Sequence, residues 1–300
     1  MELNLKNRPF NLNHTLNCGQ AFRWDKIDNW WYGVVKENII KIKQIDNKLI
    51  FFTYPKENNT KLVKNYFRLN DDLNYIIRQI NKDKYINEAI RKFYGLRIIR
   101  QEPWECLISY ICATNTNIPI IRNMIFNLSK KFGEKIKFGN HKFYTFPKAC
   151  ILAKAGLDIL KKCGIGYRAE YISKASKMTN NNEIQFNRLS KINYQAVKKE
   201  LLQIPGVGPK VADCICLFSL DKLDAFPVDI WVTRSILELY HKYFDSLFTK
   251  KISGKKYKSL TLAEYNKINS FGKKYFGKYA GYAQEYLFYY KRMYNSFIRS

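Results

Sequence analysis

The stretch that decides the fold reads Leu201-Leu202-Gln203-Ile204-Pro205-Gly206-Val207-Gly208-Pro209-Lys210-Val211-Ala212-Asp213-Cys214. Apolar residues at helical spacing stop before Pro205 and resume after Pro209. Gly206 and Gly208 allow backbone conformations that other residues avoid. Pro209 suits the first position of a second helix, because its missing N–H needs no partner there. The stretch therefore predicts two helices, over 194–203 and 210–220, joined by a short glycine hairpin.

This hairpin predicts a binding site for an anion. The free amide groups of the turn lie at the N-terminus of the second helix, where negative charge is stabilised. Such a helix–hairpin–helix holds a DNA phosphate through backbone groups without reading the base sequence. An ordinary helical hairpin is the alternative. We favour DNA binding, because the series from Ile204 to Gly208 followed by Lys210 is tighter than an ordinary hairpin requires.

Lys210 and Asp229 are the candidate catalytic pair. Lys210 lies in the first turn of its helix, where the helix dipole disfavours a cation and so favours a nucleophilic amine. A phosphate contact is the alternative role. Cys214, four residues on, shares its helix face. Asp229 precedes an apolar helix, so it can cap that helix and still offer a carboxylate oxygen to a substrate. An amine and a carboxylate together suit glycosidic bond cleavage.

The composition indicates a polyanionic partner. The 300 residues include 52 Lys and Arg against 25 Asp and Glu, for a net charge of +27. Such a surface attracts nucleic acid. A lysine-rich proteome encoded by low-GC DNA is the alternative explanation of this charge. Hydrophobic residues make up 46% of the chain, enough for a sizeable core.

Cysteine spacing and apolar runs exclude several classes of protein. The seven cysteines are scattered without C-x-x-C spacing, so we expect free thiols, no structural metal and no cofactor. No apolar run reaches the length of a membrane span, and residues 1–10 lack the pattern of a signal peptide. We expect a monomer inside the cell, with no membrane partner.

Periodicity divides the chain into two parts. Residues 31–35, 39–45 and 49–54 alternate as an antiparallel meander, and 62–67 and 73–80 are helical. From residue 89 the chain is helical, over 105–113, 118–132, 149–161, 171–178, 194–203, 210–220, 230–240 and 279–297. The predicted class is α+β, with an N-terminal antiparallel β/α domain over 1–88 and a helical domain over 89–300.

The motifs resemble those of the 8-oxoguanine DNA glycosylases of the helix–hairpin–helix superfamily over nearly the whole chain. Beyond the hairpin and Pro227-Val228-Asp229, the likeness is carried by residues 18–24 (CGQAFRW), 95–103 (GLRIIRQEP), 115–118 (NTNI), 164–168 (GIGYR) and 279–288 (YAGYAQEYLF). The resemblance implies a TBP-like antiparallel sheet domain followed by a helical glycosylase domain. Its implied partner is duplex DNA that contains 8-oxoguanine.

The resemblance also implies a role for each matched residue. Lys210 would attack C1′ of the damaged nucleotide, displace the base and form a Schiff base that permits β-elimination. Asp229 would stabilise the cationic sugar. Gly19 would accept the N7 hydrogen, which 8-oxoguanine has and guanine lacks. Gln284 would bind the Watson–Crick edge of the base. Two side chains, Cys214 and Phe288, would sandwich the extruded purine.

The remaining implied roles concern the DNA. Asn115 would fill the space that the extruded base leaves, opposite its orphaned partner. Tyr167 would wedge into the base stack, and Arg168 would contact the orphaned base. Gly206 and Gly208 would let the hairpin backbone approach a phosphate.

Two positions depart from the eukaryotic members of the family and look like its bacterial branch. An arginine that favours cytosine opposite the lesion is matched by Ile120, with Arg122 two residues further on. The loss of a guanidinium that binds a base edge predicts weaker discrimination of the opposite base. A histidine that follows the catalytic aspartate is matched by Trp231, so the phosphate contacts there must differ.

Three other interpretations remain open at this point. A glycosylase for another damaged base is one of them, although an adenine or pyrimidine enzyme would carry iron–sulfur cysteines and an alkylpurine enzyme would lack Lys210. A non-catalytic helix–hairpin–helix module would need neither Lys210 nor Asp229. A lysine-rich structural protein would explain only the charge.

Overall fold

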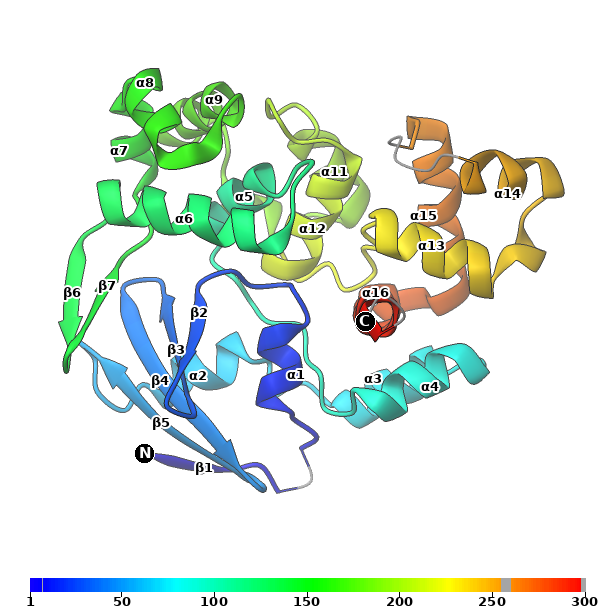
Figure 1. The fold of residues 1–300 in the computed structure, drawn as a ribbon, viewed down its shortest axis with the longest axis horizontal. Coiled ribbons are helices and arrows are strands. Elements are labelled where there is room, and N and C mark those ends of the chain that lie inside the picture. Colours follow the sequence, from blue (N-terminus) through cyan, green and yellow to red (C-terminus); the bar gives the residue numbers. More distant parts are fainter. Residues whose placement is uncertain (7, 255–259, 298–300) are drawn as a thin grey trace.

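The computed structural model describes residues 1–6, 8–254 and 260–297, and it places a sheet beside a larger helical part (Figure 1). The strands are β1 (Glu2–Asn4), β2 (Trp24–Ile27), β3 (Trp30–Val35), β4 (Asn38–Ile45) and β5 (Lys48–Tyr54). They form one antiparallel sheet in the order β1-β5-β4-β3-β2. The predicted α+β class with an N-terminal antiparallel sheet is confirmed.

The sheet is built from tight hairpins with one apolar face. Asp28 and Asn29 join β2 to β3 with φ values of 45° and 63°, the left-handed conformations that a two-residue hairpin turn requires. On β4 the side chains of Ile40 and Ile42 are buried, whereas Lys41 between them lies on the other face. The sequence predicted β3, β4 and β5 and missed the short strands β1 and β2. The Asp28-Asn29 pair was a signal for β2.

Helices make up the rest of the described chain. Two belong to the sheet part: α1 (Leu12–Asn17) and α2 (Thr60–Tyr66). The others are α3 (Leu73–Ile80), α4 (Lys84–Lys92), α5 (Pro103–Cys112), α6 (Ile118–Phe132), α7 (Ala149–Lys154), α8 (Leu157–Leu160), α9 (Arg168–Asn180), α10 (Phe186–Leu189), α11 (Tyr194–Leu201), α12 (Pro209–Ser219), α13 (Ile230–Leu239), α14 (Ser246–Ser253), α15 (Leu262–Phe276) and α16 (Ala280–Phe297). Single turns lie at η1 (Lys161–Ile165), η2 (His241–Tyr243) and η3 (Gly277–Tyr279), and a hairpin lies at β6 (Lys135–Phe138) and β7 (His141–Tyr144).

Most predicted helices are present within a few residues, but the single helix predicted over 149–161 is wrong. It divides into α7 and α8, because the backbone is extended at Ala155 and Gly156, with ψ near 132° and 143°. Glycine has little preference for helix, so this is where the chain can turn. The sequence reading also missed α15, although Thr261 and Glu264 form a capping box at its start.

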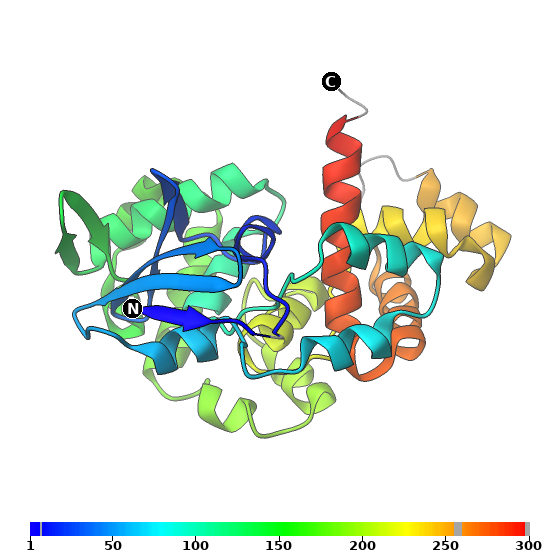
Figure 2. The same cartoon turned by 90° about the horizontal axis from the view of Figure 1, so that it is seen from below.

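Two apolar cores hold the molecule together. The smaller core lies between the sheet and helices α1 and α2, with Trp24 and Phe51 among its largest buried side chains. The larger core includes side chains of α3 and α4 together with those of α5, α12 and α16. In Figures 1 and 2, α16 runs between the α3–α4 pair and α13. The domain boundary at residue 88 stays a prediction.

The structure also bears on the cysteines and on membrane insertion. All seven cysteines are free thiols, and Cys150 is the exposed one. Among the helices of the described residues, none combines the length and the apolar character needed to cross a membrane.

Candidate active site

A cleft of about 1510 Å³ opens where α5, α6, α12, α13 and α16 meet the loop between α1 and β2. Eight of the residues that the sequence predicted for the site line it, namely Gly19, Asn115, Gly208, Lys210, Cys214, Asp229, Gln284 and Phe288. Tyr167, Arg168 and Gly206 lie outside its lining. The cleft therefore brings the proposed catalytic and base-binding residues together from distant parts of the sequence.

The hairpin between α11 and α12 has the predicted geometry. Gly206 has a φ of 84°, and a Cβ there would lie 2.7 Å from Tyr171 Cβ, so both conformation and space require glycine. Gly208 precedes α12 and is exposed, with no atom within 4 Å of an added Cβ. Pro209 is the first residue of α12. Open space therefore lies beside the N-terminus of α12, as an anion site there requires.

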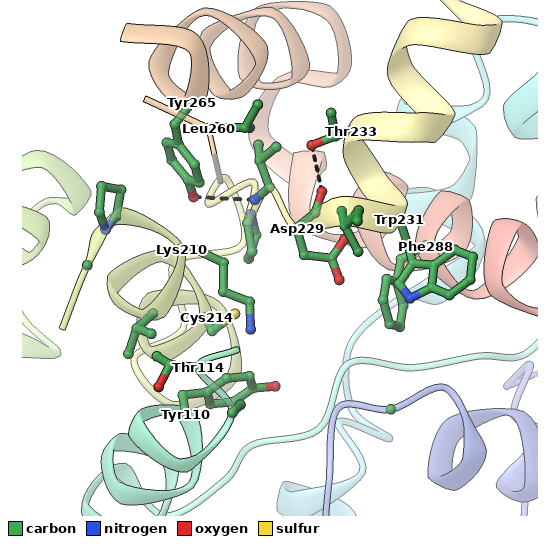
Figure 3. A pocket seen from close by; sticks show the side chains of 18 of the residues that line it. Tyr110, Thr114, Lys210, Cys214, Asp229, Trp231, Thr233, Leu260, Tyr265 and Phe288 are labelled. Carbon is green, nitrogen blue, oxygen red and sulfur yellow. Dashed lines mark hydrogen bonds between the residues drawn. The ribbon is translucent and has the colours of Figure 1, made fainter. Parts of the chain in front are cut away.

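Lys210 extends into the cleft from the first turn of α12 (Figure 3). Its Nζ lies 5.0 Å from the centre of the Tyr110 ring, which forms part of the cleft wall. Cys214, one turn further along α12, is buried. Burial raises the pKa of the Cys214 thiol to about 12, and the charge of Lys210 opposes this shift. Cys214 therefore presents a neutral, polarisable sulfur to the cleft.

Asp229 caps α13 and also lines the cleft. Its Oδ1 accepts a hydrogen bond of 2.8 Å from the Val232 N–H, which caps α13. Its backbone carbonyl accepts from Thr233 Oγ1 at 2.7 Å (Figure 3). Burial raises the pKa of Asp229, whereas the Val232 N–H and the charge of Lys210 act in the opposite direction. The carboxylate is thus fixed in place and electrostatically coupled to Lys210.

A buried hydrogen-bond network centred on Asp213 supports the segment that carries Asp229. The sequence analysis did not predict this network. The carboxylate of Asp213 is fully buried and accepts from the hydroxyls of Tyr194 and Tyr265, each at 2.5 Å, and from Lys198 Nζ at 2.8 Å. Tyr265 in turn accepts from the backbone N–H of Val228, the residue before Asp229. Asp213 therefore connects α12 to the segment that carries Asp229.

Gln284 and Phe288 lie one turn apart on α16 and line the cleft together. Gln284 is buried, and its Oε1 has no hydrogen-bond partner. Phe288 is half-buried. An unpaired amide oxygen beside a free aromatic ring face suits a flat ligand with polar edges.

Gly19 is held in place by its neighbour Gln20, another residue that the sequence reading missed. Gly19 has a φ of 106°, which favours glycine. The Gln20 side chain donates to the carbonyls of Thr15 and Arg97 at 2.9 and 2.8 Å and accepts from the Ile99 N–H at 2.9 Å. The Gly19 backbone is therefore presented to the cleft from a rigid loop.

The residues predicted to enter the DNA lie at the outer edge of the site. Asn115 is exposed with a φ of 50°, a conformation that asparagine tolerates. Tyr167 is 53% exposed at the start of α9. Arg168 is buried instead: its guanidinium donates to the carbonyl of Thr114 and lies 4.6 Å from the Tyr167 ring centre. Arg168 therefore ties the Tyr167 turn to the loop that carries Asn115.

The positions that depart from the eukaryotic pattern also have defined places. Ile120 is 49% exposed on α6. Arg122 cannot replace the missing guanidinium there, because its Nη2 donates to the Trp24 carbonyl at 2.8 Å and to the Asp25 carboxylate at 2.5 Å. Trp231 lines the cleft at the start of α13.

The fold and the cleft are those of a helix–hairpin–helix DNA glycosylase. Residues 2–107 match the family model of the 8-oxoguanine DNA glycosylase N-terminal domain. The chain is 30% identical to an N-glycosylase/DNA lyase of Saccharomyces cerevisiae, over 92% of this chain and 82% of the relative. It is 32% identical to the N-glycosylase/DNA lyase OGG1 of Arabidopsis thaliana, over 95% of this chain and 78% of the relative.

A solved structure gives the same result. The 8-oxoguanine glycosylase/lyase of Clostridium acetobutylicum, in complex with double-stranded DNA that has cytosine opposite 8-oxoguanine, superimposes with a TM-score of 0.84 at 32% identity. The match covers 95% of this chain and 93% of that one. The chain therefore belongs to the 8-oxoguanine DNA glycosylase family, the N-glycosylase/DNA lyases.

Proposed function

We propose that this protein excises 8-oxoguanine from duplex DNA and then cuts the strand at the abasic site, as a bifunctional glycosylase and lyase. The observation that carries the proposal is the convergence of Lys210, Asp229, Gln284 and Gly19 in one cleft. The family relationship supports the same reaction. Because its substrate is cellular DNA, the protein works inside the cell.

The damaged base enters the cleft by leaving the DNA stack, at a cost of a few kcal/mol. The Gly19 carbonyl accepts the N7 hydrogen of 8-oxoguanine, and the unpaired Oε1 of Gln284 faces the Watson–Crick edge. Normal guanine presents a lone pair at N7, which would leave two acceptors facing each other in a buried site. Cys214 and Phe288 cover the two faces of the purine. These contacts select the lesion over guanine.

Lys210 is the nucleophile. Its side chain extends into the cleft from the first turn of α12 (Figure 3), and Cys214 and Asp229 line the same cleft. The Nζ lone pair forms a bond to C1′ while the bond from C1′ to N9 breaks and the base leaves with a proton. Opening of the sugar ring gives a Schiff base between Lys210 and C1′. Loss of a 2′ proton then expels the 3′ phosphate, which cuts the strand by β-elimination.

Asp229 stabilises the positive charge that develops on the sugar as the base departs. The cap to Val232 fixes the carboxylate and the hydrogen bond from Thr233 fixes the Asp229 backbone, so little reorganisation is needed during the reaction. Its place in the cleft lining together with Lys210 supports this role. It therefore acts on the same sugar that Lys210 attacks.

The hairpin and the exposed edge of the cleft hold the DNA. The hairpin around Gly206 and Gly208 binds a phosphate through backbone amides. Asn115 and Tyr167 fill the space that the extruded base leaves, and the buried Arg168 supports them by joining the two loops that carry them. With Ile120 apolar and Arg122 engaged by Trp24 and Asp25, no guanidinium at these two positions reads the opposite base.

Borohydride trapping on 8-oxoguanine duplexes tests the nucleophile. Reduction of the Schiff base should link wild-type protein covalently to DNA, whereas Lys210→Gln should bind the same duplex without becoming linked. Capture of the mutant at the wild-type level would show that another residue attacks. Lys222→Gln, on a half-buried lysine outside the cleft lining, is the matched control and should be trapped like the wild type.

The same duplexes separate the remaining interpretations. A non-catalytic module would bind the DNA and release no base. An alkylpurine glycosylase would release alkylated purines and form no trapped species. With C, T, G or A opposite the lesion, we expect excision rates within about tenfold of one another, because a single lost base-edge contact is worth about 1–3 kcal/mol. A preference for cytosine above a hundredfold would contradict the relaxed recognition.

A further inference from the structure

Three buried polar atoms without partners gather on α16 at the cleft. They are Gln284 Oε1, Glu285 Oε1 and Arg292 Nη1, and all three residues line the cleft. Buried polar groups are normally paired, so such atoms indicate where a ligand binds. Gln284 already has a role in the proposed function. Arg292 is different, because its unpaired Nη1 is a hydrogen-bond donor, whereas the unpaired atoms of Gln284 and Glu285 are oxygens.

Arg292 is held rigidly in place. Its Nη2 donates to the carbonyl of Asn17, two residues before Gly19. Its Cζ lies 5.3 Å from the ring centres of both Phe288 and Tyr289. Among the described residues no carboxylate forms an ion pair with it, and Glu285 and Asp229 interact with it only at longer range. The guanidinium therefore cannot easily turn to find an acceptor for Nη1.

The unpaired Nη1 lies directly against Gly19. A Cβ on Gly19 would overlap Arg292 Nη1, and it would also approach Ile118 Cδ1 at 3.1 Å and Phe288 Cε1 at 3.3 Å. Glycine at this position thus gives the guanidinium access to the part of the cleft where the Gly19 carbonyl lies. A ligand bound against the Gly19 backbone therefore lies beside Nη1.

The proposed contacts leave the oxygen that oxidation adds to the base unpaired. Its N7 hydrogen is taken by Gly19, and its Watson–Crick edge, including O6, is taken by Gln284. The oxygen on C8, next to N7, has no donor in this scheme. A buried carbonyl oxygen without a donor is unfavourable. The unpaired donor of the protein and the unpaired acceptor of the lesion therefore lie on the same side of the base.

We propose that Arg292 is a specificity residue that donates a hydrogen bond from Nη1 to the C8 oxygen of 8-oxoguanine. This inference rests on the proposed function and deepens it. Guanine has a hydrogen at C8, so it would leave the charged donor unpaired. Arg292 and Gly19 then recognise the two adjacent features that oxidation creates, the C8 oxygen and the N7 hydrogen.

The test compares duplexes that contain 8-oxoguanine with duplexes that contain 8-thioguanine. Both bases carry the N7 hydrogen, but sulfur accepts hydrogen bonds weakly. Single-turnover excision rates give a selectivity, the rate for 8-oxoguanine divided by the rate for 8-thioguanine. We expect Arg292→Leu to lower this selectivity about ten- to hundredfold, the range for hydrogen bonds to charged groups. The size of sulfur affects both proteins alike and cancels in the comparison.

Two further variants separate recognition from charge and from folding. Arg292→Lys keeps the positive charge. Its single amine cannot donate both to the Asn17 carbonyl and to the C8 oxygen in the geometry of the guanidinium, so this variant should also lose selectivity. If Arg292→Leu does not fold, the selectivity of Arg292→Lys decides the test instead. Lys291→Leu removes the same charge from the same helix at a residue outside the cleft lining. It should lower both rates by the same factor.

The outcomes distinguish this inference from the proposed function. Equal losses of Arg292→Leu on the two bases, or unchanged selectivity in Arg292→Lys, would overturn the contact to the C8 oxygen. Failure of the wild-type protein to release 8-oxoguanine at all would overturn the proposed function itself. A selectivity that falls in both Arg292 variants and stays at the wild-type value in Lys291→Leu supports the assignment.

Discussion

The carboxyl of Glu285 should make the protein less stable as the pH rises through neutrality. Burial raises the pKa of Glu285 from 4.5 to about 7, and the charge of Asp229 raises it further, against lowering effects of Cys18, Arg292 and Lys210. The folded protein therefore keeps a proton that the unfolded chain releases from about pH 4.5 upward. Where the folded state binds more protons, the free energy of unfolding falls with pH.

The size of the effect follows from the shift. A difference of one pKa unit corresponds to 1.36 kcal/mol. The shift of Glu285 therefore costs about 3 kcal/mol of unfolding free energy, and this cost is absent below pH 4.5 and complete above pH 7. Glu285→Gln keeps the shape and cannot ionise. The unfolding free energy of Glu285→Gln relative to the wild type should therefore rise by about 3 kcal/mol between pH 4.5 and pH 7.

Urea unfolding followed by tryptophan fluorescence measures this difference. Wild type, Glu285→Gln and the exposed control Glu57→Gln would be unfolded at intervals between about pH 4.5 and 8.5. The other buried carboxyls titrate in the wild type and in both variants alike. The informative quantity is therefore the unfolding free energy of the wild type minus that of the variant at each pH. If that difference for Glu285→Gln changes by less than about 1 kcal/mol across the range, Glu285 does not titrate as the structure indicates.

Three further predictions concern single substitutions. Ile120→Arg places a guanidinium on the exposed face of α6 and should create a cytosine preference of about tenfold in excision; unchanged rates with all four opposing bases would argue against that location. Gly206→Ala should destabilise by about 1–3 kcal/mol in thermal unfolding, because of the φ of 84° and the contact with Tyr171, and a neutral result would contradict the hairpin geometry. Asp213→Asn should cost about 3–5 kcal/mol in urea unfolding, because Lys198 would keep a partly buried charge without its partner; a loss below about 1 kcal/mol would show that the network is not needed.

Local chemistry explains which elements the sequence could predict. The α11–α12 hairpin was predictable because Gly206, Gly208 and Pro209 set its backbone directly. The central strands were predictable from alternation along β4 and β5. The break at Gly156 had a local signal, but the residues on both sides of it have the pattern of one helix. The capping box at Thr261 also had a local signal, but it follows a polar stretch that is typical of a loop.

The supporting residues of the site could not be predicted, because their partners are distant in sequence. Gln20 bonds to Arg97 and Ile99 across almost 80 residues, and Arg292 reaches Asn17 from the other end of the chain. Neither pairing leaves a trace in periodicity or composition. The resemblance to a known family identified Lys210 and Asp229 as candidates. Only the fold shows that Asp213 is connected through Tyr265 to the residue before Asp229.

The location of the cleft on α16 shows the limit of pattern reading most clearly. Every residue from Ala280 to Leu287 is buried, so apolar periodicity cannot tell which face of the helix meets a ligand. Gln284 and Glu285 are adjacent, and a local reading would place them on different faces. Their unpaired oxygens and the unpaired nitrogen of Arg292 mark the ligand side instead. In a helix buried on all sides, an unsatisfied polar atom helps to locate the binding face only where it also lines the cleft, because Tyr282 on the same helix has an unpaired hydroxyl outside the lining.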